Sequence, residues 1–226
     1  MNNIKDPIIK VDHDEVYVPS DDTYLMMDYL RNTVTAESFD DLPLSLISNI
    51  LDMGSGSGII AIFLELLKEV NHDFNARIYA SDISDHAISC AKRNEKLNNI
   101  NNKITFLQSD LFNTFPMKYR NFFDVIIFNP PYLPSLEIEQ SVIQKKQIDR
   151  SWEGGKEGTE TLERFFKAAG GFLNPEHPCF IYFISSSLTN LNTLDKIIEE
   201  NGFRNEILDK KHVFFEDIIL NRNKTK

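Results

Sequence analysis

The sequence predicts a doubly wound α/β fold, in which helices cover both faces of a mostly parallel sheet. Short runs of aliphatic, β-branched and aromatic residues alternate with amphipathic segments of helical period, which is the pattern of that fold class. The chain has 226 residues, a length typical of one domain. Its 42% hydrophobic and 26% charged residues are ordinary for a globular protein with a full core.

Strands and helices are expected to alternate along most of the chain from residue 49 onward. Apolar, β-rich runs predict strands at 49–53, 76–81, 104–108, 124–128, 179–185 and 213–220. Amphipathic spacing predicts helices at 57–70, 85–97, 159–172 and 188–201. Gly202 follows the last of these helices, at the position where a helix-ending glycine is common.

The segment before the first core strand carries one predicted helix. Ser20 to Asp22 are suitable capping residues, so we expect a helix at 23–34 and a connector at 35–48. Residues 221–226 are polar and are expected to form a frayed tail. The chain 1–226 is therefore predicted to be a single domain, with an N-terminal segment at 1–48, a core at 49–220 and this tail.

Acidic side chains outnumber basic ones by 34 to 24, so the formal net charge is −10. Residues 1–50 hold 10 acids and 3 bases, a net charge of −7, and contain most of this excess. Proteins that bind nucleic acids usually have a basic excess, because Lys and Arg neutralise the phosphates. The composition therefore argues against direct binding of nucleic acid.

The cysteines and histidines show no disulfide or metal pattern. Cys90 and Cys179 lie far apart in apolar runs, which favours buried, reduced thiols. The five histidines have no ligand spacing, so no metal is predicted. No run approaches roughly 18 apolar residues and no secretory leader pattern is present, so a cytoplasmic location is expected.

A glycine-rich turn follows the first core strand. Asp52 precedes Gly54, Gly56 and Gly58, after which an apolar helix begins. Glycines permit positive φ and close approach of a ligand, and the helix N-terminus offers free N–H groups. The spacing D-x-G-x-G-x-G differs from the dinucleotide pattern, and the acid disfavours a pyrophosphate. The turn instead suits a cationic ligand such as S-adenosylmethionine, which carries a sulfonium and an ammonium group, although it could simply pack helix on strand.

Two more acids follow the second and third core strands. Asp82 can accept hydrogen bonds from both hydroxyls of a ribose, or could cap the helix that follows it. Asp110 is placed to accept from the amino group of adenine. Because parallel strands end at one edge of a sheet, these acids and the glycine turn are expected to line one ligand site.

The fourth core strand leads directly into Asn129, Pro130, Pro131 and Tyr132. The prolines fix φ and remove two N–H donors, so the Asn129 oxygen and the Pro130 carbonyl can accept both hydrogens of one planar NH₂ group. Tyr132 offers a ring face for a flat group. This arrangement aims a nitrogen lone pair at a methyl donor, which is catalysis by orientation and electrostatics. A base amine or a carboxamide would fit.

With these residues the chain resembles the class I S-adenosylmethionine-dependent methyltransferases. Within them it resembles the HemK-like enzymes that methylate glutamine in the Gly-Gly-Gln loop of class 1 release factors. Residues 16–25, V-Y-V-P-S-D-D-T-Y-L, and the segment from Trp152 to Gly158, W-E-G-G-K-E-G, are similar to motifs of the short archaeal and eukaryotic branch. The resemblance implies a Rossmann-like seven-stranded sheet, mostly parallel with an antiparallel C-terminal strand.

The resemblance also implies residue roles and partners. It assigns the cofactor to Tyr17, Thr23, Asp52, Gly54, Gly56, Gly58, Asp82, Asp110, Leu111 and Asn129, and the glutamine to Asn129, Pro130, Pro131 and Tyr132. Within the cofactor set, Asp52 serves the methionine end, Asp82 the ribose and Asp110 the adenine. A release factor is implied as the substrate, and members of the branch pair with a small zinc-containing activator protein.

Other functions stay open at this point. The amino group of adenine in RNA or DNA suits the same motif, although no basic groove or recognition domain is evident. A cofactor-binding scaffold would need no amide clamp, and lysine methylation would need a base that the sequence does not show. The segment 152–158 could be a plain loop. The acidity of residues 1–50 suggests a docking surface for a basic release-factor domain.

Overall fold

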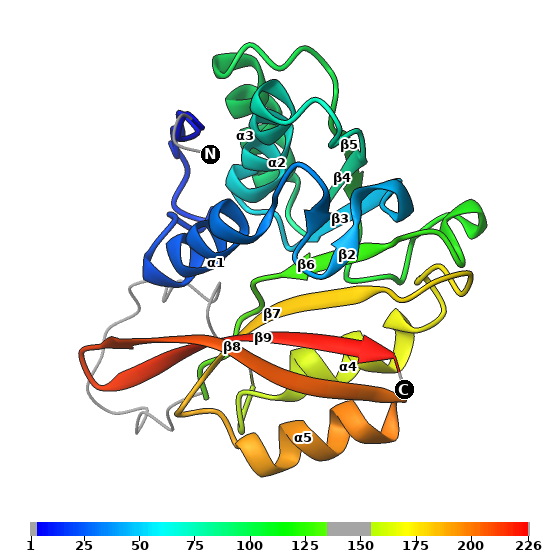
Figure 1. Ribbon diagram of the computed structural model, residues 1–226. Helices are drawn as coiled ribbons and strands as arrows, with labels where there is room; N and C mark the ends of the chain where they lie inside the picture. The colour runs from blue at the N-terminus through cyan, green and yellow to red at the C-terminus, as the bar shows by residue number, and fades with distance from the viewer. Residues whose placement is uncertain (1–3, 135–154, 226) are drawn as a thin grey trace.

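A twisted sheet forms the centre of the computed structural model, which describes residues 4–134 and 155–225 (Figure 1). The described strands of this sheet number seven and follow the order β5-β4-β3-β6-β7-β9-β8. The first five in that order run parallel, and β9 runs antiparallel to both of its neighbours, β7 and β8. The strands are β3 (Asn49–Met53), β4 (Arg77–Asp82), β5 (Thr105–Gln108), β6 (Val125–Phe128), β7 (Phe180–Ser186), β8 (Phe203–Val213) and β9 (Glu216–Thr225). The predicted fold class is confirmed.

Helices cover both faces of the sheet, as Figure 1 shows. One apolar core lies between the sheet and α1 and α2, and a second lies between the sheet and α4 and α5. A short hairpin, β1 (Ser38–Phe39) and β2 (Leu42–Pro43), lies in the predicted connector. The helices are α1 (Asp21–Thr33), α2 (Ile59–Val70), α3 (Asp85–Leu97), α4 (Glu160–Ala169) and α5 (Leu191–Glu200), with 3₁₀ turns at Leu44–Leu46 and Met117–Tyr119. Among the described residues, no helix has the length and apolarity of a membrane span.

The central strands are buried on both sides, which explains their uninterrupted apolar sequences. Every residue of β3 and of β6 is buried. Ile50 packs into the core of α1 and α2, whereas its neighbour Leu51 packs into the core of α4 and α5. Strands covered on both faces need no polar alternation. This is why the core strands were predicted to within a residue or two.

The prediction for the C-terminal strands is wrong in two places. The strand expected at 213–220 spans a turn, because Phe214 has φ of 51° and the chain reverses between β8 and β9. β8 was missed because it is a polar edge strand with little apolar alternation. Residues 221–225, expected as a frayed tail, belong to β9 and pair with β7 on one side and β8 on the other.

The polar side chains of β9 are buried by partners from distant parts of the chain. Arg222 is 4% exposed and pairs with Asp40 and, at 2.7 Å, with Glu206. Its guanidinium also lies over the Phe180 ring, 4.8 Å from the centroid. Buried charges need such pairing. A strand of this composition is stable only in this particular environment.

Ion pairs connect the acidic N-terminal part to the rest of the protein. Asp12 pairs with Arg93 at 2.6 Å and Asp21 pairs with Lys211 at 2.7 Å. Asp41 also pairs with Arg222, at 3.0 Å. Several acids that suggested a docking surface are therefore neutralised within the molecule, which weakens that hypothesis.

The last glycine of the turn before α2 has no room for a side chain. Gly58 has φ of 81°, and a Cβ there would lie 2.7 Å from the Cβ of Ala91 in α3. Gly202 has a similar φ of 85°, but a Cβ there would meet no described atom within 4 Å. Of these two glycines, only Gly58 would combine backbone strain with a steric clash if it were replaced.

We therefore expect Gly58→Ala to destabilise the protein by about 2–4 kcal/mol, from strain plus displacement of α3. Gly202→Ala is the matched control and should cost only about 1 kcal/mol. Urea denaturation of both variants measures the difference. Equal losses would show that the packing of α3 against the turn is not tight.

Candidate active site

Four strand ends lie side by side at the carboxyl edge of the sheet. The parallel strands β5, β4, β3 and β6 are neighbours in that order. The predicted site residues that follow them therefore form a row of Asp110, Asp82, Gly54 and Asn129. A long ligand lying across this edge would meet them in that order, so the topology brings together the residues that the sequence singled out.

The glycine turn between β3 and α2 leaves space beside its backbone. Gly54, Gly56 and Gly58 have φ values of 64°, 52° and 81°. Among the described residues, a Cβ at Gly56 would meet only the Tyr17 side chain, at 4.0 Å. The N–H of Gly56 donates to Asp82 Oδ2 at 2.9 Å. The second strand end thus holds the turn in position.

Asp82 is anchored by backbone groups and still has acceptor capacity. Its Oδ1 accepts from the N–H of Ser84 at 2.9 Å, in addition to the bond from Gly56. Burial raises the pKa of this carboxyl. Each carboxylate oxygen has a second lone pair that can accept from a ribose hydroxyl. The helix cap is made by Ser84, whose Oγ accepts from the N–H of Ala87 at 3.3 Å.

Asp52 is a buried acid whose carboxyl accepts few hydrogen bonds. Its side chain accepts one hydrogen bond from the N–H of Ala61, at 3.1 Å, and the residue is 3% exposed. Burial, with a smaller contribution from the charge of Asp82, raises the pKa of Asp52 to about 8. A cationic neighbour would reverse this effect, because it favours the ionised form.

Asp110 is engaged by a residue that no motif indicated. The Arg164 guanidinium, from α4, pairs with its carboxylate, and the side-chain amide of Asn113 donates to it at 3.1 Å. Leu111, next in the chain, has φ of 49°. An adenine amino group would have to share the Asp110 carboxylate with Arg164. The adenine role of Asp110 and Leu111 stays a prediction.

The side-chain oxygen of Asn129 is an unsatisfied acceptor. Asn129 Nδ2 donates to the Thr23 hydroxyl at 3.4 Å. Its Oδ1 is buried and accepts a hydrogen bond from no described residue. Buried acceptors are normally paired, so an orphaned one needs an explanation. It is the atom that the sequence assigned to one N–H of a substrate.

Tyr132 faces the N-terminal segment. Its hydroxyl donates to Asp22 at 3.2 Å, and the residue is 7% exposed. Burial and the nearby Asp22 carboxylate raise the pKa of Tyr132. The ring belongs to the core between the sheet and α1. Its expected stacking on a flat substrate group stays a prediction.

Asp22 is a functional candidate that sequence reasoning missed. It is 3% exposed, and it accepts from the hydroxyls of Tyr17, Thr23 and Tyr132 at 2.9, 3.0 and 3.2 Å. The sequence suggested only helix capping, and the N-cap residue Ser20 in fact makes no side-chain capping bond. The available signal was the V-Y-x-P-x-x-D-T spacing, which places an acid beside Thr23.

Two contacts from the second half of the chain hold the loop of Tyr132. The Thr189 hydroxyl donates to the Tyr132 carbonyl at 2.9 Å. A Cβ at Gly158 would lie 2.5 Å from the same carbonyl oxygen, so only glycine fits there. Trp152 and Gly154 of the same motif lie outside the described residues. Gly158 thus has a packing task at the Tyr132 loop, which the sequence did not assign.

The residues present fit S-adenosylmethionine. The open space beside Gly56 and the unsatisfied buried hydroxyl of Ser55 lie on the turn, and the buried acid Asp52 lies at the end of the strand that leads into it. The buried acid suits the cationic end of the cofactor, and the acceptors of Asp82 suit a ribose. The buried carboxyl of Asp52 and the partly buried carboxyl of Asp82 disfavour a large anionic group.

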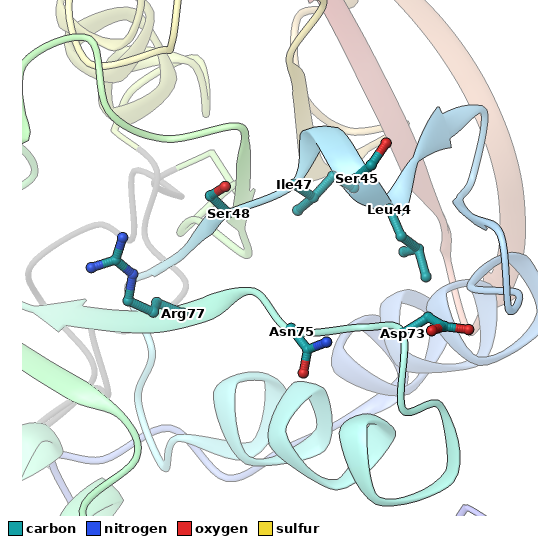
Figure 2. Close-up of a pocket in the computed structure, with 7 residues that line it drawn as sticks. All are labelled: Leu44, Ser45, Ile47, Ser48, Asp73, Asn75 and Arg77. Carbon is teal, nitrogen blue, oxygen red and sulfur yellow. The ribbon is translucent and has the colours of Figure 1, made fainter.

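A pocket of about 380 Å³ lies away from this row (Figure 2). It is lined by Leu44, Ser45, Ile47, Ser48, Asp73, Asn75 and Arg77. Arg77 pairs with Asn49 at the start of β3 and β4, so the pocket lies at the amino edge of the sheet. It is shallow and offers no acid to a cationic ligand except Asp73.

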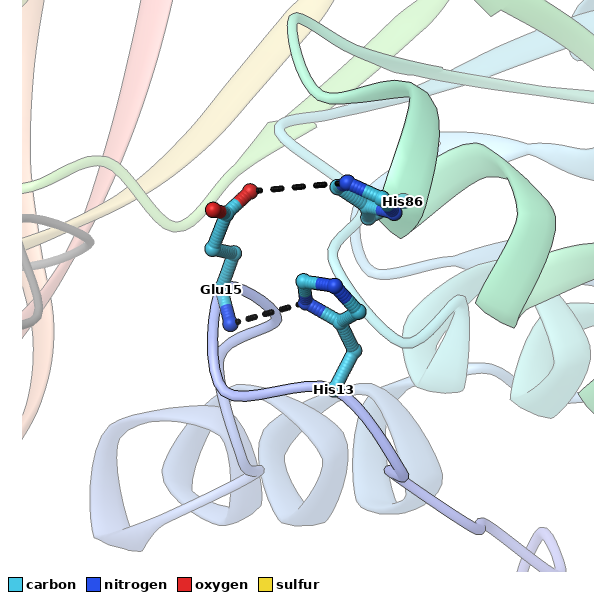
Figure 3. A group of neighbouring side chains, drawn as sticks. All are labelled: His13, Glu15 and His86. Atoms are coloured by element: carbon cyan, nitrogen blue, oxygen red, sulfur yellow. Dashed lines mark hydrogen bonds and ion pairs between the residues drawn. The ribbon is translucent and has the colours of Figure 1, made fainter.

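Among the described residues, two clusters contain potential metal ligands. His13, Glu15 and His86 lie together on the surface (Figure 3). The two imidazole rings stack with centroids 3.8 Å apart and planes within 16°, so one ion cannot lie in both ring planes unless a ring rotates. In the second cluster, Asp124 already accepts from the N–H groups of Ser48 and Asn49, which ties β6 to β3. The absence of a metal stays a prediction.

Comparisons with known proteins identify the family. The family model for the methyltransferase small domain matches residues 35–149. A protein of Methanocaldococcus jannaschii that is named for protein N5-glutamine methylation is 33% identical over 208 residues, which are 92% of this chain and 91% of that protein. The chain belongs to the methyltransferase small domain family. Within it, this methyltransferase belongs to the HemK2-like, short archaeal and eukaryotic branch of the class I enzymes, as the motifs predicted.

More distant relatives are consistent with this family and with this fold. Methyltransferase HEMK2 of Homo sapiens is 27% identical over 190 residues, 84% of this chain and 80% of the human protein. The fold matches the E. cuniculi Mtq2–Trm112 complex that methylates the termination factor eRF1, with a TM-score of 0.59 and 20% identity over 94% of this chain and 99% of that one. The family uses S-adenosylmethionine as its methyl donor.

The raised pKa of Asp52 predicts a pH-dependent affinity for S-adenosylmethionine. Below about pH 8 the buried carboxyl of the free protein is mostly protonated, and a cationic ligand favours its ionised form. Binding should therefore release a proton, and the affinity should rise by up to about tenfold per pH unit as the pH approaches 8.

Calorimetric titration in two buffers of different ionisation enthalpy measures this proton release. Asp52→Asn is the control, because it removes the titrating group and leaves the shape of the site. Equal pH slopes for the wild type and this variant would contradict the assignment of Asp52 to the cationic end.

Proposed function

We propose that this methyltransferase transfers a methyl group to the side-chain amide nitrogen of a protein glutamine. The observation that supports this most directly is the buried Oδ1 of Asn129, which accepts no hydrogen bond from a described residue. A primary amide has two N–H donors on a planar nitrogen. Asn129 Oδ1 and the carbonyl of Pro130 can accept one each.

The residues of the chain would act by holding and orienting. Two acceptors fix the plane of the amide, and the nitrogen then has only its lone-pair direction free for reaction. Acceptors that remain fixed as the nitrogen gains positive charge stabilise the transition state. S-adenosylmethionine, when bound, supplies an electrophilic methyl group on its sulfonium. Asp52 would hold its cationic end and Asp82 its ribose, in the row that ends at Asn129.

We further propose the Gly-Gly-Gln loop of a class 1 release factor as the substrate. The M. jannaschii relative is named for protein glutamine methylation, and the E. cuniculi complex methylates a termination factor. A glutamine on an exposed loop can reach a recessed acceptor, whereas a base in a duplex must first be flipped out. The net charge of −10 also favours a protein over nucleic acid.

A small zinc-containing activator protein is proposed as a partner at the β5 edge of the sheet. In the E. cuniculi complex the methyltransferase is bound to Trm112. Of the two edges, β8 exposes Asp209, Lys210 and Lys211, and such charges oppose pairing with another chain. β5 has no charged residue, and its Phe106 and Leu107 are partly exposed. The β5 edge is therefore the better surface for an apolar interface.

An assay with radiolabelled cofactor tests the substrate. The label should enter a release factor and should be absent from its loop variant with Gln replaced by Ala and from RNA. Transfer should be faster when the activator protein is present. Label in RNA, or in the loop variant, would contradict the proposal and favour methylation of adenine or of another residue.

Asn129→Ala separates catalysis from cofactor binding. Removing the acceptor should lower the rate of transfer by about 100-fold or more, because the amide is no longer oriented. The affinity for S-adenosylmethionine, measured by calorimetry, should change by less than about threefold, since Asp52 and Asp82 remain. A comparable loss of both would mean that Asn129 serves the cofactor rather than the substrate.

A further inference from the structure

A chain of hydrogen bonds leads from Asp22 to Asn129. The Thr23 hydroxyl donates to Asp22 Oδ1 at 3.0 Å, and Asn129 Nδ2 donates to the same hydroxyl at 3.4 Å. Asp22 and Thr23 are 3% and 4% exposed, so water does not compete strongly for these groups. The three residues connect the N-terminal segment with the end of β6, over a sequence separation of 106 residues.

The number of protons in this chain determines its direction. A carboxylate only accepts, and a hydroxyl has one proton. The Thr23 proton is committed to Asp22, so the Thr23 oxygen can only accept from the next group. Of the two ends of the Asn129 amide, only the NH₂ group donates. It must therefore face Thr23, and Oδ1 must point the other way.

The reversed orientation of the Asn129 amide would make an unfavourable contact at each end of the group. Turned by 180°, Asn129 would place its oxygen against a Thr23 oxygen that has no proton to offer. It would also present its NH₂ group where an incoming substrate amide brings an N–H, so two donors would face each other. The orientation of one side chain thus decides whether the site can accept a primary amide.

Asp22 is held as an acceptor from several sides. The hydroxyls of Tyr17 and Tyr132 donate to it at 2.9 and 3.2 Å, and so does the backbone N–H of Thr23. No Lys or Arg among the described residues pairs with Asp22 within 4.0 Å, so its bonds come from neutral donors. The same carboxylate contacts Tyr132 directly and Asn129 through Thr23, and so reaches both ends of the substrate loop.

We propose that Asp22 is a positioning residue whose carboxylate, acting through the Thr23 hydroxyl, holds the Asn129 amide with Oδ1 available to the substrate. This rests on the proposed function, in which Asn129 Oδ1 accepts an N–H of the glutamine. Asp22 touches neither substrate nor cofactor in this role. Its effect is on the direction in which another side chain offers its acceptor.

Three substitutions test the proposal by their effect on transfer to the release factor. Thr23→Val removes the hydroxyl with little change of shape, Thr23→Ser keeps it, and Asp22→Asn introduces a donor that can reverse the chain. Thr23→Val and Asp22→Asn should lower kcat by about 100-fold, with little change in the KM for the release factor. Thr23→Ser should restore most of the rate. Ser20→Ala, at the exposed start of the same helix, is the control and should behave as wild type.

A second measurement does not depend on activity. In protein labelled with ¹⁵N-asparagine, the side-chain NH₂ signals of Asn129 are identified by their loss in Asn129→Ala. They should shift in Thr23→Val and Asp22→Asn, but not in Ser20→Ala. Thermal unfolding of each variant shows whether it is folded. If Asp22→Asn does not fold, Thr23→Val still tests the proposal.

The outcomes separate the two proposals. If Asn129→Ala is inactive while Thr23→Val and Asp22→Asn transfer within about threefold of wild type, Asp22 has no positioning role and the proposed function stands. If Thr23→Ser is as slow as Thr23→Val, the hydroxyl is not the connecting group. If Asn129→Ala itself keeps its activity, the proposed function is wrong.

Discussion

The site depends on one topological constraint, the shared carboxyl edge of four parallel strands. The chain moves outward from β3 to β4 and β5, then returns to β6 on the other side of β3 and continues to β7. The strand order therefore reverses at β3, which is where open α/β sheets bind ligands. Every polar group that follows these strands must then share one small region. The glycine turn, the buried acids and the Asn129 loop are neighbours for this reason, although 77 residues separate Asp52 from Asn129 in the chain.

Much of the fold could be predicted, because the buried core strands appear in the sequence as uninterrupted apolar runs. β3 and β6 are apolar throughout, since both faces are covered, and such runs are clear in any sequence. β8 and β9 could not be predicted in this way. The buried side chain of Arg222 is stable only because Asp40 and Glu206 meet it, and these partners come from a hairpin and a strand far away in the chain. Local sequence carries no information about such compensation.

The same division applies to the site. The motifs predicted which residues follow the strand ends, and the topology places them in one row. They could not predict Asp22 as the common acceptor of three hydroxyls, Arg164 beside Asp110, or the task of Gly158, because each is a contact between segments that meet only in the folded chain. The N-terminal acids were interpreted as a surface for a partner. Pairs such as Asp12 with Arg93 indicate that several of them attach the N-terminal segment to the core.

The loop of Tyr132 also receives support from residues that follow it in the chain. Thr189 donates to the Tyr132 carbonyl, and Gly158 leaves the space for that carbonyl. All the groups that bear chemistry are synthesised by residue 132, yet their geometry is not complete until residue 189 has been added. During translation, a nascent chain would therefore contain every side chain proposed for catalysis well before it could act as an enzyme.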